Sequence, residues 1–370
     1  MRIMDPAVPE VARDLATSAA TVSLLATAFA FPYAFSQPVL GPMADALGKA
    51  RIIKVCLSVL LVTLLIAAVA PTIEILFAAR VVSGIAAGGI IPVALAMVGD
   101  RFSMNERHVA ISRINMAAVT GQLTSAIGAG LVASLWSWRI ALAAAGSATL
   151  AVLIASLLKL APRPKAEAKK FTYAGFKSGY ATIFANPRAI VCYGAVSVEG
   201  IAVYGIIPYV ATLFEAQHIG GVREAGIVIA GIGIGGLIYT LRVKTLLNFL
   251  GGVFNVMRAG GMIAAAGLCI VAWQPAWPVQ FGAFALLGMG FFMVHNGLQM
   301  YATELAPDAR GSAVALHAFF FFLGQAVGPV LYRLGFASIG VAATVMCCAA
   351  AMVAVGLLAP RALERFSARP

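Results

Sequence analysis

Glu199 is the residue whose type and position in the sequence most directly indicate chemistry. It lies within an apolar stretch, residues 189–213, that contains no other charged residue. Ionisable side chains inside such stretches are costly to bury and are therefore often functional. Glu199 is suited to carry a proton or to bind a cationic substrate. The alternative is a structural role, in which a protonated Glu199 only hydrogen-bonds to a neighbouring helix.

A second group of polar residues lies in the apolar stretch 279–302. His295 and Gln299 are four residues apart and so share one face of a helix, and Asn296 follows His295 directly. We expect this face to line a cavity that binds substrate or a coupling ion. The alternative is that these side chains only form hydrogen bonds between helices. Weaker candidates of the same kind are Gln122, His317 and Gln325.

Arg80 lies near the start of the apolar stretch 73–98 and is a candidate for responding to proton movement. Its long side chain can equally extend to the edge of a membrane. The four His and five Cys residues do not gather at the spacings of metal ligands. No nucleophile–base pair or phosphate-binding loop stands out either. We therefore expect no metal site, no cofactor and no enzymatic activity.

The composition indicates the elements that must position these side chains. Hydrophobic residues make up 61% of the chain and charged residues only 11%, and the mean hydropathy is +0.95. Such values are far from those of soluble domains and indicate a chain that lies mostly in lipid. Runs of about 20 apolar residues without alternation predict membrane-spanning helices and not a barrel of strands. The expected spans are 17–40, 52–70, 73–98, 109–134, 139–160, 188–213, 223–246, 254–273, 279–302, 311–334 and 336–359.

The single long polar segment, residues 161–187, divides these spans into two groups. We expect an N-terminal helical half at 1–160, a basic cytoplasmic linker at 161–187 and a C-terminal helical half at 188–370. Most of the 26 Lys and Arg residues fall in alternate loops, which predicts that those loops and the C-terminus are cytoplasmic and the N-terminus external. The net charge of +12 then reflects topology and anionic lipid, so no nucleic-acid partner is expected.

The two halves show a weak internal repeat. One spacing separates Gly48 from Gly251 and also separates Arg107 from Arg310, and it relates segments of the same predicted orientation. Such a parallel repeat is typical of transporters built from two related helical halves.

Several of these residues form a pattern that resembles a known family. The segment Gly41-x-x-x-Asp45-x-x-Gly48-Lys49-x-Arg51 is similar to the loop between the second and third helices of the major facilitator superfamily, with departures at positions 46 and 50. The spacing Arg80-x-x-x-Gly84-x-x-x-Gly88 is similar to the fourth-helix signature of that family, and Asp100 and Arg107 are similar to the polar loop that follows it. The resemblance implies that these loop residues, Gly41, Asp45, Gly48, Lys49, Arg51, Asp100 and Arg107, take part in gating.

The resemblance also implies a fold and a function. The fold would be an all-α polytopic membrane bundle of two pseudo-symmetric halves, with about eleven helices where the family has twelve, because the first helix has no counterpart here. The function would be secondary transport of a small molecule by alternating access, most like proton-coupled efflux of a drug or metabolite. The partners would be protons, the substrate and the lipid bilayer, and we expect a monomer in a bacterial plasma membrane. Uptake of a small organic solute, or a non-transporting role as a membrane sensor or assembly partner, remain the alternatives.

Overall fold

The computed structural model describes residues 4–101, 117–118, 120–121, 124–125, 127–160, 181–302, 304–306 and 310–367, and no strand occurs among them. A first helical set, α1 to α8, comprises α1 (Val8–Asp14), α2 (Ala19–Ser23), α3 (Leu25–Leu47), α4 (Lys49–Ala68), α5 (Ile73–Gly88), α6 (Ile90–Arg101) and α8 (Trp138–Lys159), and residues 127–135 are also helical. A second helical set, α10 to α16, comprises α10 (Pro187–Tyr204), the 3-10 turn η1 (Ile207–Tyr209), α11 (Val210–Ala216), α12 (Val222–Leu250), α13 (Val253–Ala272), α14 (Trp277–Ala302), α15 (Arg310–Ser338) and α16 (Val341–Ser367).

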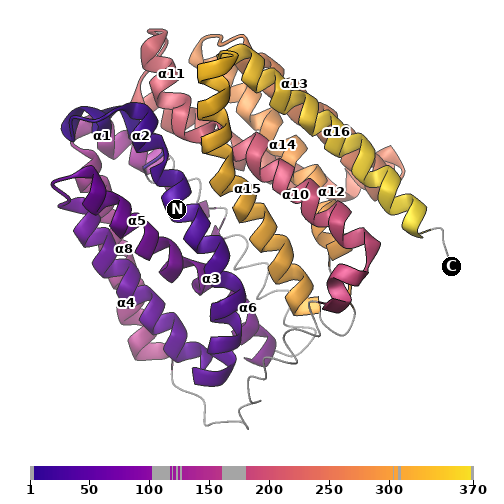
Figure 1. The fold of residues 1–370 in the computed structure, drawn as a ribbon, viewed down its shortest axis with the longest axis horizontal. Helices are drawn as coiled ribbons and strands as arrows, with labels where there is room; N and C mark the ends of the chain where they lie inside the picture. The colour runs from indigo at the N-terminus through magenta and orange to yellow at the C-terminus, as the bar shows by residue number, and fades with distance from the viewer. Residues whose placement is uncertain are drawn as a thin grey trace.

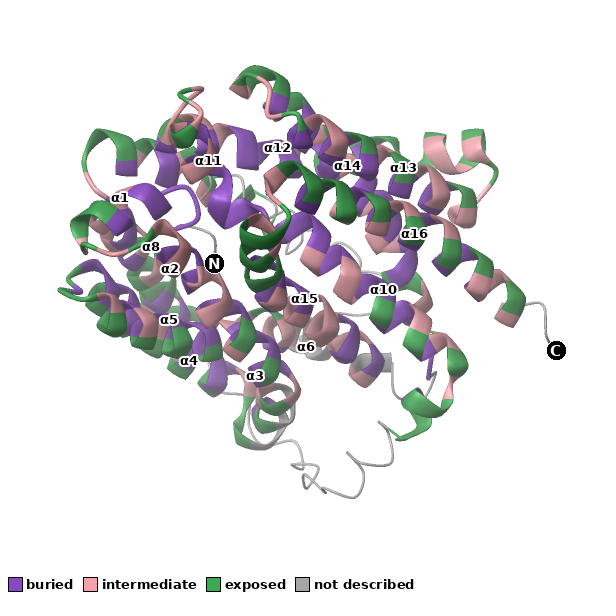
Figure 2. Cartoon of the chain, turned by 45° about the horizontal axis from the view of Figure 1, so that its top comes forward, coloured by how far each residue is buried: buried purple, intermediate pink, exposed green. Residues whose placement is uncertain are grey.

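Ten helices of the described residues are long and apolar enough to cross a membrane. They agree with ten of the expected spans, and the all-α membrane bundle is confirmed. The remaining expected span, 109–134, falls largely outside the described residues. The outer surface carries large apolar side chains, as a lipid-facing surface should. Leu158, Ile190, Phe249 and Trp273 are each about four-fifths exposed or more, and exposed positions follow the outer faces of the helices (Figure 2).

The two sets lie side by side and meet along α3 and α15 (Figure 1). In the first set, α5 packs against α3 and α4, and α4 also packs against α8. In the second set, α14 packs against α12 and α13, while α10 packs against α15 and α16. We call the end of the bundle that carries α1, α2 and α11 the α1 end, and the opposite end, where α3 joins α4, the Gly48 end.

Glycines bring the helices of each set into close contact. A Cβ atom on Gly84 of α5 would overlap the carbonyl oxygen of Phe29 on α3. Likewise, a Cβ atom on Gly200 of α10 would overlap the carbonyl oxygen of Phe321 on α15, and one on Gly324 would overlap that of Ser197. Small residues at such crossings let two backbones approach, which is how helices associate in lipid. Glu199 is therefore on a helix that is held tightly against α15.

The turn at the Gly48 end is shorter than the sequence pattern predicts. We expected a break over residues 41–51, but α3 continues through Gly41 and Asp45 to Leu47, and α4 begins at Lys49. Gly48 alone makes the turn, with a positive φ of 98°. Gly251, its counterpart in the weak repeat, also has a positive φ, 77°, between α12 and α13. Both positions need the backbone freedom of glycine, since a side chain disfavours positive φ.

Candidate functional site

The structure brings Glu199 and His295 together inside the second helical set. Glu199, in the second half of α10, is 0% exposed, and its Oε2 atom lies 3.1 Å from Nδ1 of His295 on α14. The His295 side chain is 13% exposed. These two candidates are far apart in the sequence, and only the packing of α10 against α14 makes them a pair.

His317 lies next to this pair. It is on α15, is 1% exposed, and its ring centre is 5.0 Å from that of His295 with the ring planes at 63°. Nε2 of His317 and Oε1 of Glu199 are buried and have no hydrogen-bond partner among the described residues. Glu199, His295 and His317 together are called the Glu–His–His cluster below.

Aromatic rings surround the Glu–His–His cluster. The His295 ring centre lies 4.9 Å from that of Phe291, one turn earlier on α14, and 4.7 Å from that of Phe321, one turn after His317 on α15. Phe291 and Phe321 stack on each other at 5.7 Å, and Tyr204 of α10 approaches both rings edge-on. A shell of this kind excludes water, which strengthens hydrogen bonds inside it and makes an unpaired charge costly.

The other polar candidates on α14 and α15 differ in burial and in their contacts. Asn296 is half-buried and forms a hydrogen bond with Tyr239 of α12. Gln299, one turn after His295, is exposed. Gln325, the weaker candidate on α15, is buried. The shared helix face of His295 and Gln299 therefore extends from the buried cluster to an exposed position near the Gly48 end.

Arg80 is buried in the first helical set. Its side chain on α5 is 2% exposed, and its guanidinium carbon lies 4.4 Å from the ring centre of Phe29 on α3. A cation over an aromatic face is attracted by the ring's quadrupole. The guanidinium of Arg80 is therefore packed against α3 inside the first helical set and is not on its exposed surface. Arg80 contacts α3, the helix of the first set that packs against α15.

The structure describes some of the candidate gating residues fully, some by their backbone only and some not at all. Lys49 is half-buried and Arg51 exposed in the first turn of α4, directly after Gly48. The backbones of Gly41 and Asp45 belong to α3 and that of Asp100 to α6, but the side chains of Asp45 and Asp100 are outside the described part. Gln122 and Arg107 lie outside the described residues altogether.

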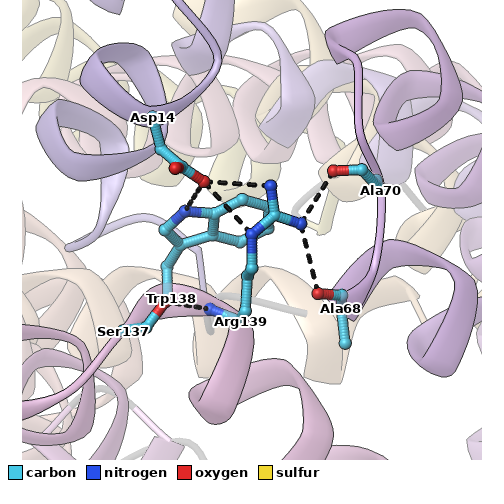
Figure 3. Close-up of polar contacts among 6 residues, drawn as sticks. All are labelled: Asp14, Ala68, Ala70, Ser137, Trp138 and Arg139. Carbon is cyan, nitrogen blue, oxygen red and sulfur yellow. Dashed lines mark hydrogen bonds and ion pairs between the residues drawn. The ribbon is translucent and has the colours of Figure 1, made fainter.

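A polar cluster at the α1 end holds three helices together, and sequence reasoning missed it (Figure 3). Asp14, at the end of α1, accepts hydrogen bonds from Nε1 of Trp138 and Nε of Arg139, both at 3.1 Å. Nη1 of Arg139 donates to the carbonyl oxygens of Ala68 at 3.3 Å and Ala70 at 2.7 Å, just where α4 ends. A cation at a helix C-terminus satisfies carbonyls that have no partner within the helix.

Contacts between the two helical sets run from the α1 end to the middle of α3. Arg13 of α1 forms a 3.3 Å ion pair with Glu215 of α11. The Thr27 hydroxyl of α3 donates to the Ala326 carbonyl of α15 at 2.6 Å. Further along α3, Tyr33 meets Phe322 with ring centres 4.4 Å apart. These contacts join the sets on the α1 side of the bundle.

The comparison with family models decides the identity. Residues 1–329 match the model of the Major Facilitator Superfamily. The chain belongs to this superfamily. It is therefore a membrane transporter and not an enzyme, and the expected resemblance is confirmed.

Curated relatives of this major facilitator are drug-resistance proteins. It is 21% identical over 326 residues to Multidrug resistance protein 1 of Bacillus subtilis (strain 168), covering 88% of this chain and 83% of that protein. It is 23% identical over 336 residues to Quinolone resistance protein NorA of Staphylococcus aureus (strain MRSA252), with the same coverage.

Solved structures share the fold of this major facilitator. The nucleoside transporter NupG aligns with a TM-score of 0.72 at 15% identity, covering 99% of this chain and 95% of that one. The human organic anion transporter MFSD10 aligns with a TM-score of 0.66 at 14% identity, covering 96% and 89%. At these identities the likeness concerns the fold alone.

Proposed function

We propose that this major facilitator exports a small organic molecule, a drug or metabolite, in exchange for protons across a bacterial plasma membrane. The observation that carries the proposal is the Glu199–His295 pair, buried in an aromatic shell within the second helical set. The drug-resistance names of the curated relatives support export of a small organic molecule.

The burial of Glu199 gives a physical reason for exchange. An ionised carboxylate inside an apolar shell needs a positive partner, since a buried charge without one is strongly destabilising. A proton supplies that partner, and so does a cationic group of a substrate. Because both occupy the same carboxylate, binding of one displaces the other. Competition of this kind at a site that faces each side in turn couples two opposite flows.

The remaining candidates have roles around this pair. Asn296, Gln299 and Gln122 would contact substrate, and Arg80 would respond to the charge of the pair through α3 and α15. The loop residues near Gly48 would gate the end that we expect to be cytoplasmic, since Lys49 and Arg51 are placed there. Movement of the two helical sets about the contact of α3 with α15 would then expose the pair alternately to each side.

Transport in proteoliposomes tests the proposal. A counterflow screen of quinolones, lipophilic cations and nucleosides first selects a probe that the parent protein exchanges. An imposed pH gradient should then drive uphill flux of that probe against the proton flow in the parent. Glu199→Gln should lose gradient-driven flux, because its amide neither takes up the proton nor pairs with a cationic group.

Other outcomes would contradict the proposal in distinct ways. Probe movement in the same direction as the protons would establish the uptake alternative. Gradient-driven flux that is unchanged in Glu199→Gln would remove Glu199 from the coupling site. A parent that exchanges no probe from any class would favour the sensor or assembly role.

A further inference from the structure

α15 contacts the first helical set on one face. Phe319 meets Phe35 of α3 with ring centres 5.0 Å apart, and Phe322 meets Tyr33 of α3 at 4.4 Å. Phe319 and Phe322 are three residues apart and so point to the same side of the helix. This face of α15 is part of the contact about which the two helical sets would have to move.

A different face of α15 contacts the Glu199–His295 pair. His317 and Phe321, four residues apart, both lie against the His295 ring, at 5.0 and 4.7 Å between ring centres. His295 is in turn bonded to Glu199. α15 is therefore the helix that touches both the Glu199–His295 pair and α3 of the other set.

Whether Nε2 of His295 carries a hydrogen depends on how many protons the Glu199–His295 pair holds. With one hydrogen, the pair carries a negative charge, that hydrogen lies between Nδ1 and the carboxylate, and Nε2 is an acceptor. With a second proton, the pair is neutral, either as a carboxylate with an imidazolium or as a carboxylic acid with an imidazole that accepts at Nδ1. In both forms Nε2 carries a hydrogen and becomes a donor. Loading one proton thus creates one buried donor that needs an acceptor.

His317 is placed to supply that acceptor. We infer that His317 is a positioning residue of the proton site, whose Nε2 accepts the hydrogen bond from Nε2 of proton-loaded His295 and so transmits loading to α15. The only atom gained is the bound proton, which forms one new N–H bond at Nε2, while the hydrogen already in the pair stays between Nδ1 and the carboxylate. This inference rests on the proposed function, because it assumes that the Glu199–His295 pair takes up and releases a proton. It explains why an imidazole with an unpartnered Nε2 is buried on a helix that contacts both the Glu199–His295 pair and the first helical set.

Other titratable side chains lie on the helices that surround this region. They are Tyr193 and Tyr204 of α10, Tyr33 of α3, Tyr239 of α12, Tyr332 of α15 and Cys348 of α16, while Arg258 of α13 is paired with Glu364 of α16. Phenol groups keep their protons below about pH 9, so they do not titrate in the range of the test. Glu199→Gln keeps Cys348 and the Arg258–Glu364 pair, so a pH-dependent shift that is absent in this variant belongs to the Glu–His–His cluster and not to those groups.

A distance measurement between the two helical sets tests this inference without a substrate. Spin labels are placed at Leu47 of α3 and Phe249 of α12, which are 52% and 85% exposed at the Gly48 end, after replacement of the exposed Cys347 by serine. The full-length protein is reconstituted in lipid nanodiscs, and distance distributions are recorded by electron–electron double resonance from pH 5 to pH 9. The parent should shift between two distance populations with pH, and Glu199→Gln should show no shift.

Two substitutions at His317 separate the hydrogen bond from packing. His317→Phe keeps a ring but removes the acceptor, and it should abolish the shift or move its midpoint by at least one pH unit. His317→Gln offers an amide oxygen near the position of Nε2 and should restore the parent midpoint within about 0.3 pH units. His218→Asn, which removes an imidazole from the positive-φ turn after α11, is the matched control and should behave as the parent. Melting curves in detergent show which variants are folded.

The outcomes distinguish the inference from the proposed function. If the parent shifts with pH and His317→Phe shifts with the same midpoint and amplitude, the role of His317 is overturned and the proposed proton coupling is not. If His317→Phe does not fold, a His317→Gln midpoint displaced as far as one pH unit would overturn it. A parent without any pH-dependent shift and without gradient-driven flux would overturn the proposed proton coupling and the inference with it.

Discussion

Replacing Arg139 by alanine should destabilise the protein by about 2 kcal/mol. The two bonds to the carbonyl oxygens of Ala68 and Ala70 are the larger part, at about 0.5–1 kcal/mol each, because these residues are 7% and 0% exposed and lie at the end of α4. The ion pair with Asp14 adds only about 0.5 kcal/mol, since the two side chains are 31% and 47% exposed. The stacking of the guanidinium on Trp138 at 4.4 Å adds about 0.5 kcal/mol.

Thermal unfolding in detergent, followed by the reaction of buried cysteines with a fluorescent dye, measures this effect. Arg139→Ala should lower the unfolding midpoint by several degrees. Arg139→Lys keeps the charge but not the planar fork of donors, so it should recover less than half of the loss. Asp14→Asn should cost much less than Arg139→Ala, because it leaves both carbonyl bonds intact. The exposed Arg333, on α15, provides the control, and Arg333→Ala should change stability by less than about 0.5 kcal/mol.

This reasoning would be refuted if the losses of stability did not rank as predicted. If Asp14→Asn were as destabilising as Arg139→Ala, the ion pair and not the carbonyl bonds would hold α1, α4 and α8 together. If neither variant changed the midpoint, the polar cluster at the α1 end would make no net contribution to stability.

Three further predictions concern other parts of the molecule. Burial raises the pKa of the Glu10 carboxyl in spite of the nearby Arg13. The folded protein therefore binds the proton of Glu10 more tightly than the unfolded chain does, and its stability falls as the pH rises above about 4.5. Glu10→Gln should raise the melting midpoint at pH 7 and leave it unchanged at pH 4. Gly200→Ala should lower both stability and transport because its Cβ would overlap the backbone of α15, whereas Gly194→Ala on the same helix meets open space and should match the parent in both assays. Asp45→Asn should increase labelling of cysteines introduced at the Gly48 end if Asp45 takes part in gating that end, as the resemblance implies, and equal labelling of variant and parent would remove Asp45 from the gate.

Much of the fold could be predicted from the sequence because lipid imposes a simple rule. Long apolar runs must be helices, and ten of the expected spans are present among the described residues. The boundary at Gly41 was wrong because polar and small residues near a membrane surface do not end a helix. The helix ends at Gly48, where the backbone takes a positive φ that other residues disfavour.

The site could be predicted only in part, since side-chain direction depends on how helices pack. Glu199 stood out because a lone carboxylate in an apolar run is costly in any arrangement. Its partner could not be chosen from sequence, and Gln299, which shares a helix face with His295, is exposed. His317 was rated below them, yet it lies against His295 because α15 crosses next to α14. The contact between Asp14 and Arg139 was not predicted, because charges at span ends are often unpaired.

Proton release on substrate binding tests the central claim most directly. The purified protein in weakly buffered detergent solution is mixed with the probe selected by counterflow, and the pH change is recorded with an indicator dye. Parent protein should release protons when the probe binds, and Glu199→Gln, which has no carboxylate to exchange, should release none. Proton release of equal size from Glu199→Gln would contradict the account, because the exchanged proton would then be bound at a group other than the Glu199–His295 pair.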